Sequence, residues 1–168
     1  MADGASAATT FVMTPTTPQA RFESLGLTLP PAPKPLGLYK PCVVAGSWVQ
    51  TSGHLPVLPD GSLMKGRVGV AVDADAGKQA ARQAGLAIVA SLVAAFGSLD
   101  RIRRVVKVVG LVNAAPDFHK HPAVVNGCSE LFAEIWGPDL GVGARIALGA
   151  GGLPEDVTVE IEAVFELA

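Results

Sequence analysis

The chain has 168 residues, of which 49% are hydrophobic and 17% are charged, and its formal net charge is −2. This length and composition suit one globular domain and argue against general disorder. A nucleic-acid binder normally carries a basic surplus, which is missing here. The two cysteines, Cys42 and Cys128, lie far apart in the sequence, which excludes a zinc ribbon and a disulfide-rich scaffold and favours reduced thiols in a cytoplasmic protein.

The first 36 residues differ in composition from the rest of the chain. Residues 1–18 are rich in Ala, Thr, Ser and Pro, and they predict a disordered tail that is not a secretory signal. The spacing of apolar residues in Gln19–Leu25 predicts a short helix. Prolines in Leu29–Pro41 predict an extended connector. We therefore expect a tail at 1–18, a helix and connector at 19–36, and one domain at 37–168.

The next segment predicts a hairpin followed by a long helix. Cys42–Ala45 and Trp48–Ser52 are short β-type runs on either side of a Gly-Ser turn, and Gly66–Val72 predicts a further short strand. Asp73 is a suitable N-cap for a helix over Ala74–Phe96, which Gly97 ends. The apolar run within this helix is shorter than the roughly 20 residues of a membrane span, so a buried helix is expected.

The second half predicts a strand, a helix and a final strand pair. Arg103–Val112 is rich in β-branched residues and predicts a central strand. Ala123–Trp136 has helical spacing, and the Gly-Pro dipeptide that follows should stop the helix. Ala144–Leu148 and Val157–Phe165 complete an α/β (α+β) fold with one mixed sheet and two helices on one face. The other face then needs a cover, and self-association is the simplest source of one.

Three features have the chemistry of a binding site. Arg145 begins a predicted strand among small residues, and its planar guanidinium suits a carboxylate ligand. Glu160 and Glu162 lie two apart on the last strand, so both carboxylates share one face. Tyr39 is the only tyrosine of the chain and follows the proline-rich segment. On spacing alone, a structural explanation is more frequent for each feature. Arg145 would form a salt bridge, the two glutamates would lie on a solvated strand face, and Tyr39 would be a packing aromatic.

Other candidates carry weaker signals. His119 and His121 have no third ligand at metal-site spacing, so no metal site is expected. The basic run of Arg101, Arg103, Arg104 and Lys107 has no interleaved aromatics, and it favours a solvated strand edge over an RNA groove. Cys128 lies in a predicted helix and favours a buried, unreactive thiol.

The ordered set of motifs resembles the Rid family of reactive intermediate deaminases, also called YjgF-type or endoribonuclease L-PSP. The matching segments run in order from Gly37 to Leu167: Gly37-Leu38-Tyr39, Thr51-Ser52-Gly53-His54-Leu55-Pro56, Asp117-Phe118, Val125-Asn126, Ala144-Arg145, Leu153-Pro154 and Val159-Glu160-Ile161-Glu162-Ala163. Differences from the common pattern include His54 in place of Gln and Ile146 in place of Ser. With the added N-terminal helix, they resemble a longer-form branch of the family.

The resemblance implies a chorismate-mutase-like single domain that assembles as a homotrimer with clefts between subunits. It implies hydrolysis of amino-acid-derived imines or enamines to a 2-keto acid and ammonia, with no cofactor and no metal. Glu160, Tyr39 and Ser52 would be the catalytic residues. The carboxylate-bearing substrate would contact Arg145, Asn126 and Gly53. Two alternatives stay open, a trimeric carboxylate-binding or regulatory protein without turnover and, less favoured, an endoribonuclease; neither nucleic acid nor a membrane is an expected partner.

Overall fold

The computed structural model describes residues 16–35 and 37–168. The predicted tail therefore falls almost wholly outside the described residues. The helices are α1 (Pro18–Ser24), α2 (Ala74–Phe96) and α3 (His121–Leu140), with 3-10 turns η1 (Leu99–Arg101) and η2 (Pro154–Asp156). The strands are β1 (Cys42–Ala45), β2 (Trp48–Thr51), β3 (Ile102–Asn113), β4 (Ala144–Ala150) and β5 (Val159–Leu167).

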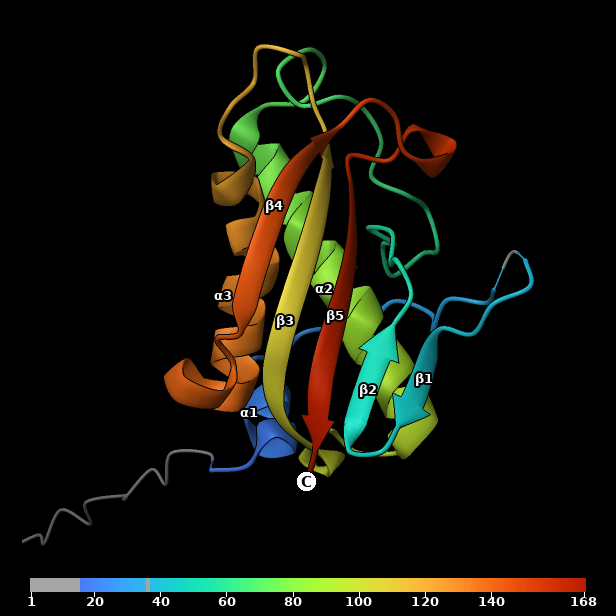
Figure 1. Ribbon diagram of the computed structural model, residues 1–168, viewed down its shortest axis with the longest axis vertical. Helices are drawn as coiled ribbons and strands as arrows, with labels where there is room; N and C mark the ends of the chain where they lie inside the picture. Colours follow the sequence, from blue (N-terminus) through green and yellow to red (C-terminus); the bar gives the residue numbers. More distant parts are fainter. Residues whose placement is uncertain (1–15, 36) are drawn as a thin grey trace, which may run out of the picture.

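The five strands form one mixed sheet in the order β1-β2-β5-β3-β4. β3 and β4 are parallel, and the other neighbours are antiparallel. Both long helices pack on one face of this sheet, and the far face carries no helix in the described part of the chain (Figure 1). The predicted fold class, a mixed sheet with two helices on one face, is confirmed.

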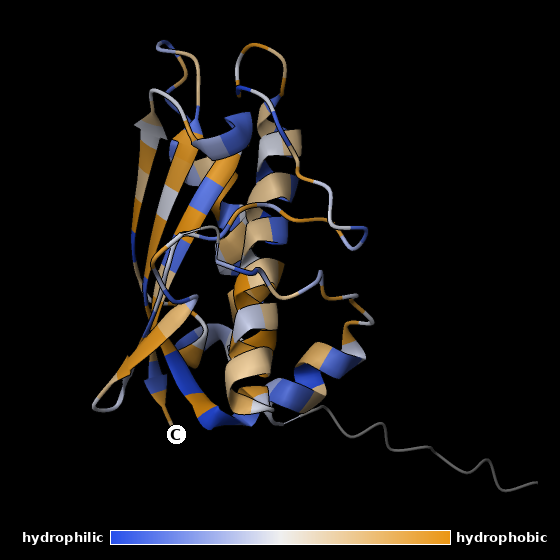
Figure 2. Ribbon diagram, turned by 90° about the vertical axis from the view of Figure 1, so that its right-hand side faces the viewer, coloured by the Kyte–Doolittle hydropathy of each residue, from blue (hydrophilic) through white to orange (hydrophobic). Residues whose placement is uncertain are grey.

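Local signals explain why α2 begins and ends where predicted. The Asp73 carboxylate accepts a hydrogen bond from the Ala76 backbone N–H at 2.7 Å, and Gly97 takes the left-handed conformation that closes the last turn. α2 is long and apolar enough to cross a membrane by length and composition, but 61% of that apolar window is buried inside this fold. α2 is therefore a core helix of the fold. It packs against the sheet on one side and against α3 on another (Figure 2).

The two long helices approach each other closely at Gly127. A methyl group at this position would meet the backbone carbonyl of Lys78 and lie 3.0 Å from the Arg82 nitrogen, so only glycine fits without a shift of backbone. α3 also continues one turn beyond the predicted stop. Gly137 has a φ of 85°, which breaks the helix geometry, and the chain resumes a helical turn at Pro138.

Two predictions about strands are wrong. Gly66–Val72 makes only isolated bridges, because the carbonyl of Arg67 accepts hydrogen bonds from the backbone N–H groups of three following residues and folds the segment into a turn. The last two strands are not a pair, because β3 lies between β4 and β5. β3 is consequently an interior strand, so its basic residues do not form a sheet edge.

The uncovered face of the sheet is partly apolar. Inward-facing residues of β5, such as Ile161 and Phe165, are fully buried, whereas Glu160 and Glu162 point to the other side. On this face, large apolar side chains exposed by 44–51% are Val43, Trp48, Ile146 and Leu148. Such a concentration of exposed apolar side chains on a regular sheet is typical of an interaction surface.

Candidate active site

Arg145 lies on β4 and is held by two neutral groups of α3. Its Nη1 donates to Asn126 Oδ1 at 2.7 Å and to Ser129 Oγ at 3.1 Å. Within residues 16–35 and 37–168, no carboxylate forms an ion pair with this exposed guanidinium. The N–H groups of Nε and Nη2 therefore remain available to a ligand. The positive charge of the guanidinium favours an anionic ligand.

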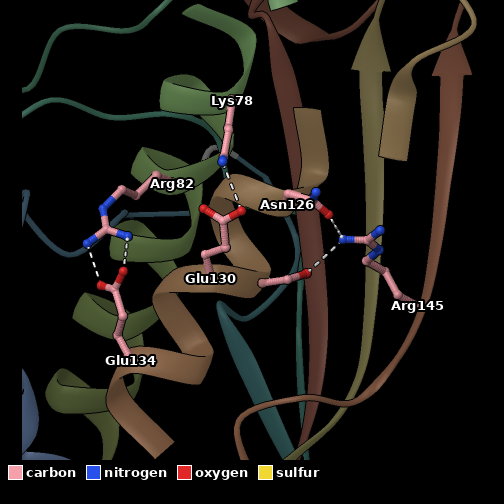
Figure 3. Close-up of polar contacts among 7 residues, drawn as sticks. Lys78, Arg82, Asn126, Glu130, Glu134 and Arg145 are labelled. Atoms are coloured by element: carbon pink, nitrogen blue, oxygen red, sulfur yellow. Dashed lines mark hydrogen bonds and ion pairs between the residues drawn. The ribbon is translucent and has the colours of Figure 1, made fainter. Parts of the chain in front are cut away.

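The neighbouring cations differ from Arg145. On the outer surface of α2, Arg82 forms two hydrogen bonds with Glu134, at 2.6 and 3.2 Å, and Lys78 pairs with Glu130 at 2.8 Å (Figure 3). Each of these basic side chains already has its carboxylate. Figure 3 shows Arg145 on the other side of α3, directed at the Asn126 amide. Among the described residues, Arg145 has no such ion pair, although a salt bridge is the more frequent state of an arginine.

A pocket of about 290 Å³ opens beside this guanidinium. Arg145, Asn126 and Ser129 supply its polar wall, and Val142 lines it together with small residues of the turn before β4. A pocket of this size lies at the lower end of those that hold small ligands. The arrangement can bind a small anion and orient it through the fork of the arginine.

Glu160 occupies the second position of β5 and faces the uncovered side of the sheet. Its carboxylate leans over Gly53 and fills the space that a side chain at Gly53 would need. Burial raises the pKa of the half-buried Glu160 carboxyl, and the negative charge of Glu162 raises it further. A carboxyl with a raised pKa exchanges protons more readily near neutral pH, as an acid–base catalyst requires.

Tyr39 and Ser52 lie near Gly53 around a pocket of only about 20 Å³, which is close to the volume of one water molecule. Ser52 Oγ donates to the backbone carbonyl of Lys40 at 2.6 Å, which fixes the hydroxyl against the connector. Tyr39 is 49% exposed. This pocket is too small for an amino-acid derivative within one chain.

The structure therefore divides the predicted site residues into two clusters. The β4 cluster contains Arg145, Asn126 and Ser129, and the β5 cluster contains Tyr39, Ser52, Gly53 and Glu160. The β4 cluster lies on the side of the sheet that the helices cover, whereas Glu160 faces the uncovered side, and β3 separates the two strands. A single copy of the chain does not bring the clusters together.

Sequence reasoning missed Ser129 and gave His54 no role. Ser129 follows Asn126 by three residues on α3, so the two polar side chains share a helix face, and that spacing is the signal that could have identified it. His54 is buried and hydrogen-bonded through both ring nitrogens. Its replacement of the glutamine common in the resembled family was the only signal.

The remaining candidates take no part in either cluster. His119 is exposed, while His121 begins α3 and makes an edge contact with Phe118. Cys128 is fully buried, and burial raises the pKa of its thiol strongly, so the thiol stays protonated. Arg103 pairs with Glu166 at 3.4 Å, and the rest of the basic run is exposed on or beside β3.

Known proteins share this fold and sequence pattern. Residues 19–159 match the family described as "YjgF/chorismate mutase-like, putative endoribonuclease". Protein TCP17 of Trypanosoma cruzi is 38% identical over 148 residues, which are 88% of this chain and 92% of that protein. RutC family protein PH0854 of Pyrococcus horikoshii is 34% identical over 134 residues, covering 79% of this chain and 90% of its own.

Crystal structures show the same similarity. A "putative endoribonuclease" of Shewanella oneidensis superposes with a TM-score of 0.85 at 31% identity, covering 90% of this chain and all of its own. The protein Atu1372 of Agrobacterium tumefaciens has a TM-score of 0.81 at 35% identity, covering 90% and 94%. E. coli TdcF, solved with bound serine, has a TM-score of 0.56 at 26% identity, covering 83% and 94%.

Proposed function

Since the chain belongs to the YjgF/chorismate mutase-like family, we propose that it hydrolyses imines or enamines derived from amino acids to a 2-keto acid and ammonia. The observation that carries this proposal is the Arg145 guanidinium, which neutral groups orient and no carboxylate of the described chain neutralises. A related protein, E. coli TdcF, binds serine, an amino acid with a free carboxylate. These facts support a small carboxylate-bearing ligand.

In the proposed mechanism, Nε and Nη2 of Arg145 hold the substrate carboxylate through two parallel hydrogen bonds. Glu160 takes a proton from a water molecule, and the water oxygen forms a bond to the imine carbon. Glu160 gives this proton to the imine nitrogen, which produces a carbinolamine and returns Glu160 to the carboxylate form. Glu160 then takes the proton of the carbinolamine hydroxyl and passes it to the amino nitrogen as the C–N bond breaks, which leaves the keto acid and ammonia.

We propose further that the site forms between copies of the chain in a homotrimer. The apolar side chains on the uncovered sheet face support association. The separation of the β4 and β5 clusters supports a shared site, because Arg145 of one copy can meet Glu160 only of another. We place this assembly in the cytoplasm, where free thiols such as those of Cys42 and Cys128 are stable.

A carboxylate-binding protein without turnover is the second candidate. The pocket beside Arg145 is built within one chain, so ligand binding there does not require Glu160. The two candidates differ in product formation. A binder saturates with keto acids but releases no ammonia, whereas the proposed enzyme binds keto acids and also releases ammonia.

The test is a coupled assay in which an amino-acid oxidase generates imines and semicarbazide traps those that survive. The wild-type protein should reduce trapping, and Arg145→Ala should not. Arg82→Ala is the matched control, because Arg82 is an arginine already paired with Glu134 on the outer helix surface, and it should behave as wild type. Unchanged trapping by wild type across a panel of amino acids would refute the enzyme proposal.

A further inference from the structure

His54 anchors the loop that carries Ser52 and Gly53 to β5. It is 3% exposed, and its backbone N–H donates to the Ile161 carbonyl at 2.7 Å while its carbonyl accepts from the Ile161 N–H at 3.0 Å. Ile161 is the immediate neighbour of Glu160. The backbone of His54 therefore fixes the loop directly beside the candidate catalytic carboxyl.

The hydrogen bonds of the imidazole assign its tautomer. Nδ1 lies 2.7 Å from the Ser52 carbonyl oxygen, which can only accept, so Nδ1 carries a proton. Nε2 lies 2.8 Å from Ser91 Oγ on α2. Burial lowers the pKa of His54 and favours the neutral ring, whose Nε2 accepts a hydrogen bond from the Ser91 hydroxyl. Neither ring nitrogen faces Glu160, so the imidazole itself is not a proton donor or acceptor for the reaction.

This hydrogen bond determines the direction of the neighbouring peptide. The Ser52 carbonyl points inward to the ring, and the peptide bond that it shares with Gly53 is trans, as are all those described. In a planar trans peptide the N–H points opposite to the carbonyl. The Gly53 N–H is therefore directed away from the His54 ring, and within residues 16–35 and 37–168 it has no hydrogen-bond acceptor.

We propose that His54 is a positioning residue, which holds the Ser52 carbonyl inward and so presents the Gly53 N–H as a fixed donor to the substrate oxygen beside Glu160. This inference rests on the proposed function. The oxygen concerned is the one that water adds to the imine carbon and that becomes the keto oxygen of the product. A preorganised backbone donor stabilises the negative charge that this oxygen develops as ammonia leaves.

The kinetic test compares two substitutions at His54. His54→Leu removes the donor to Ser52, and we expect kcat to fall about 10- to 100-fold with KM changed less than about threefold, because Arg145 still holds the carboxylate. His54→Gln supplies an amide N–H and should restore most of kcat. A folded His54→Leu protein with wild-type kcat would overturn the proposal, as would a loss confined to KM.

Two NMR measurements on the wild-type protein test the proposal without any variant. The ¹⁵N shifts of the imidazole should show a neutral ring with the proton on Nδ1. Titration with 2-ketobutyrate, a keto acid product, should shift the Gly53 amide resonance, while the Gly97 amide at the end of α2 should stay constant. A proton on Nε2, or a Gly53 amide unaffected by saturating 2-ketobutyrate, would refute the role of His54.

The outcomes separate this inference from the proposed function. If the wild type neither hydrolyses imines nor binds 2-ketobutyrate, both the proposed function and the Gly53 donor role fail. If it does both while Gly53 does not respond, only the role of His54 fails. Ser91→Ala should lower kcat less than His54→Leu does. It removes one anchor of the ring but leaves the hydrogen bond from Nδ1–H to Ser52.

Discussion

Acid should destabilise this protein through His54. Burial lowers the pKa of His54 in the folded chain below its unfolded value of about 6.5. Between those two pKa values the unfolded chain binds more protons than the folded one, so the free energy of unfolding decreases as the pH falls through that window. Above pH 6.5 both states are neutral at this residue, and the full contribution is present.

The magnitude follows from proton linkage. One proton contributes a slope of about 1.4 kcal/mol per pH unit, so His54 accounts for at most about 2 kcal/mol between pH 6.5 and 5. Urea unfolding at pH 7.5 and pH 5, at one fixed protein concentration, measures this change. His54→Gln is the matched control, because it keeps a donor for Ser52 but does not titrate.

The difference between the two proteins isolates His54, because every carboxyl group contributes equally to both. We expect wild type to lose more stability than His54→Gln between pH 7.5 and pH 5. Equal losses would show that His54 does not gain a proton on unfolding, and the neutral buried ring would then be wrong.

Three other perturbations have definite expected outcomes. Gly127→Ala should lower the free energy of unfolding by about 1–3 kcal/mol, because the methyl group meets the Lys78 carbonyl, and a normal thermal midpoint would contradict that packing. Glu160→Gln should abolish ammonia release but keep 2-ketobutyrate binding, and wild-type kcat should fall with decreasing pH below the raised pKa of Glu160, which kinetics at several pH values would measure. Leu148→Glu, on the uncovered face, should lower the mass in light scattering, and an unchanged mass would exclude that face as the interface.

The sequence predicted those elements whose ends carry local signals. Asp73 and Gly97 specify the limits of α2, and the Gly46-Ser47 turn specifies the β1-β2 hairpin. The sequence could not predict the neighbours of β5 in the same way. β5 lies between β2 and β3, and this placement depends on contacts between residues far apart in the chain. Gly66–Val72 has β-type residues, but hydrogen bonds to the Arg67 carbonyl override that propensity.

Site prediction had a similar limit. The motifs identify Arg145 and Glu160 as chemically suitable residues, but a motif does not say that a sheet lies between them. The alternation on β5 did predict that Glu160 and Glu162 share the face opposite the core. His54 acts on the backbone of its neighbours, and such a role depends on the Ser91 hydroxyl of a helix 37 residues away.

Arg145 and Glu160 should act together across two copies of the chain, and mixed assemblies test this cooperation most directly. Arg145→Ala and Glu160→Gln proteins should each fail to hydrolyse imines, so neither should reduce semicarbazide trapping. After unfolding and refolding together in equal amounts, about one quarter of the sites should combine an intact arginine from one copy with an intact glutamate from another. We predict that the mixture regains activity near that fraction of wild type. A mixture that forms hybrid assemblies and stays inactive would contradict a site shared between subunits.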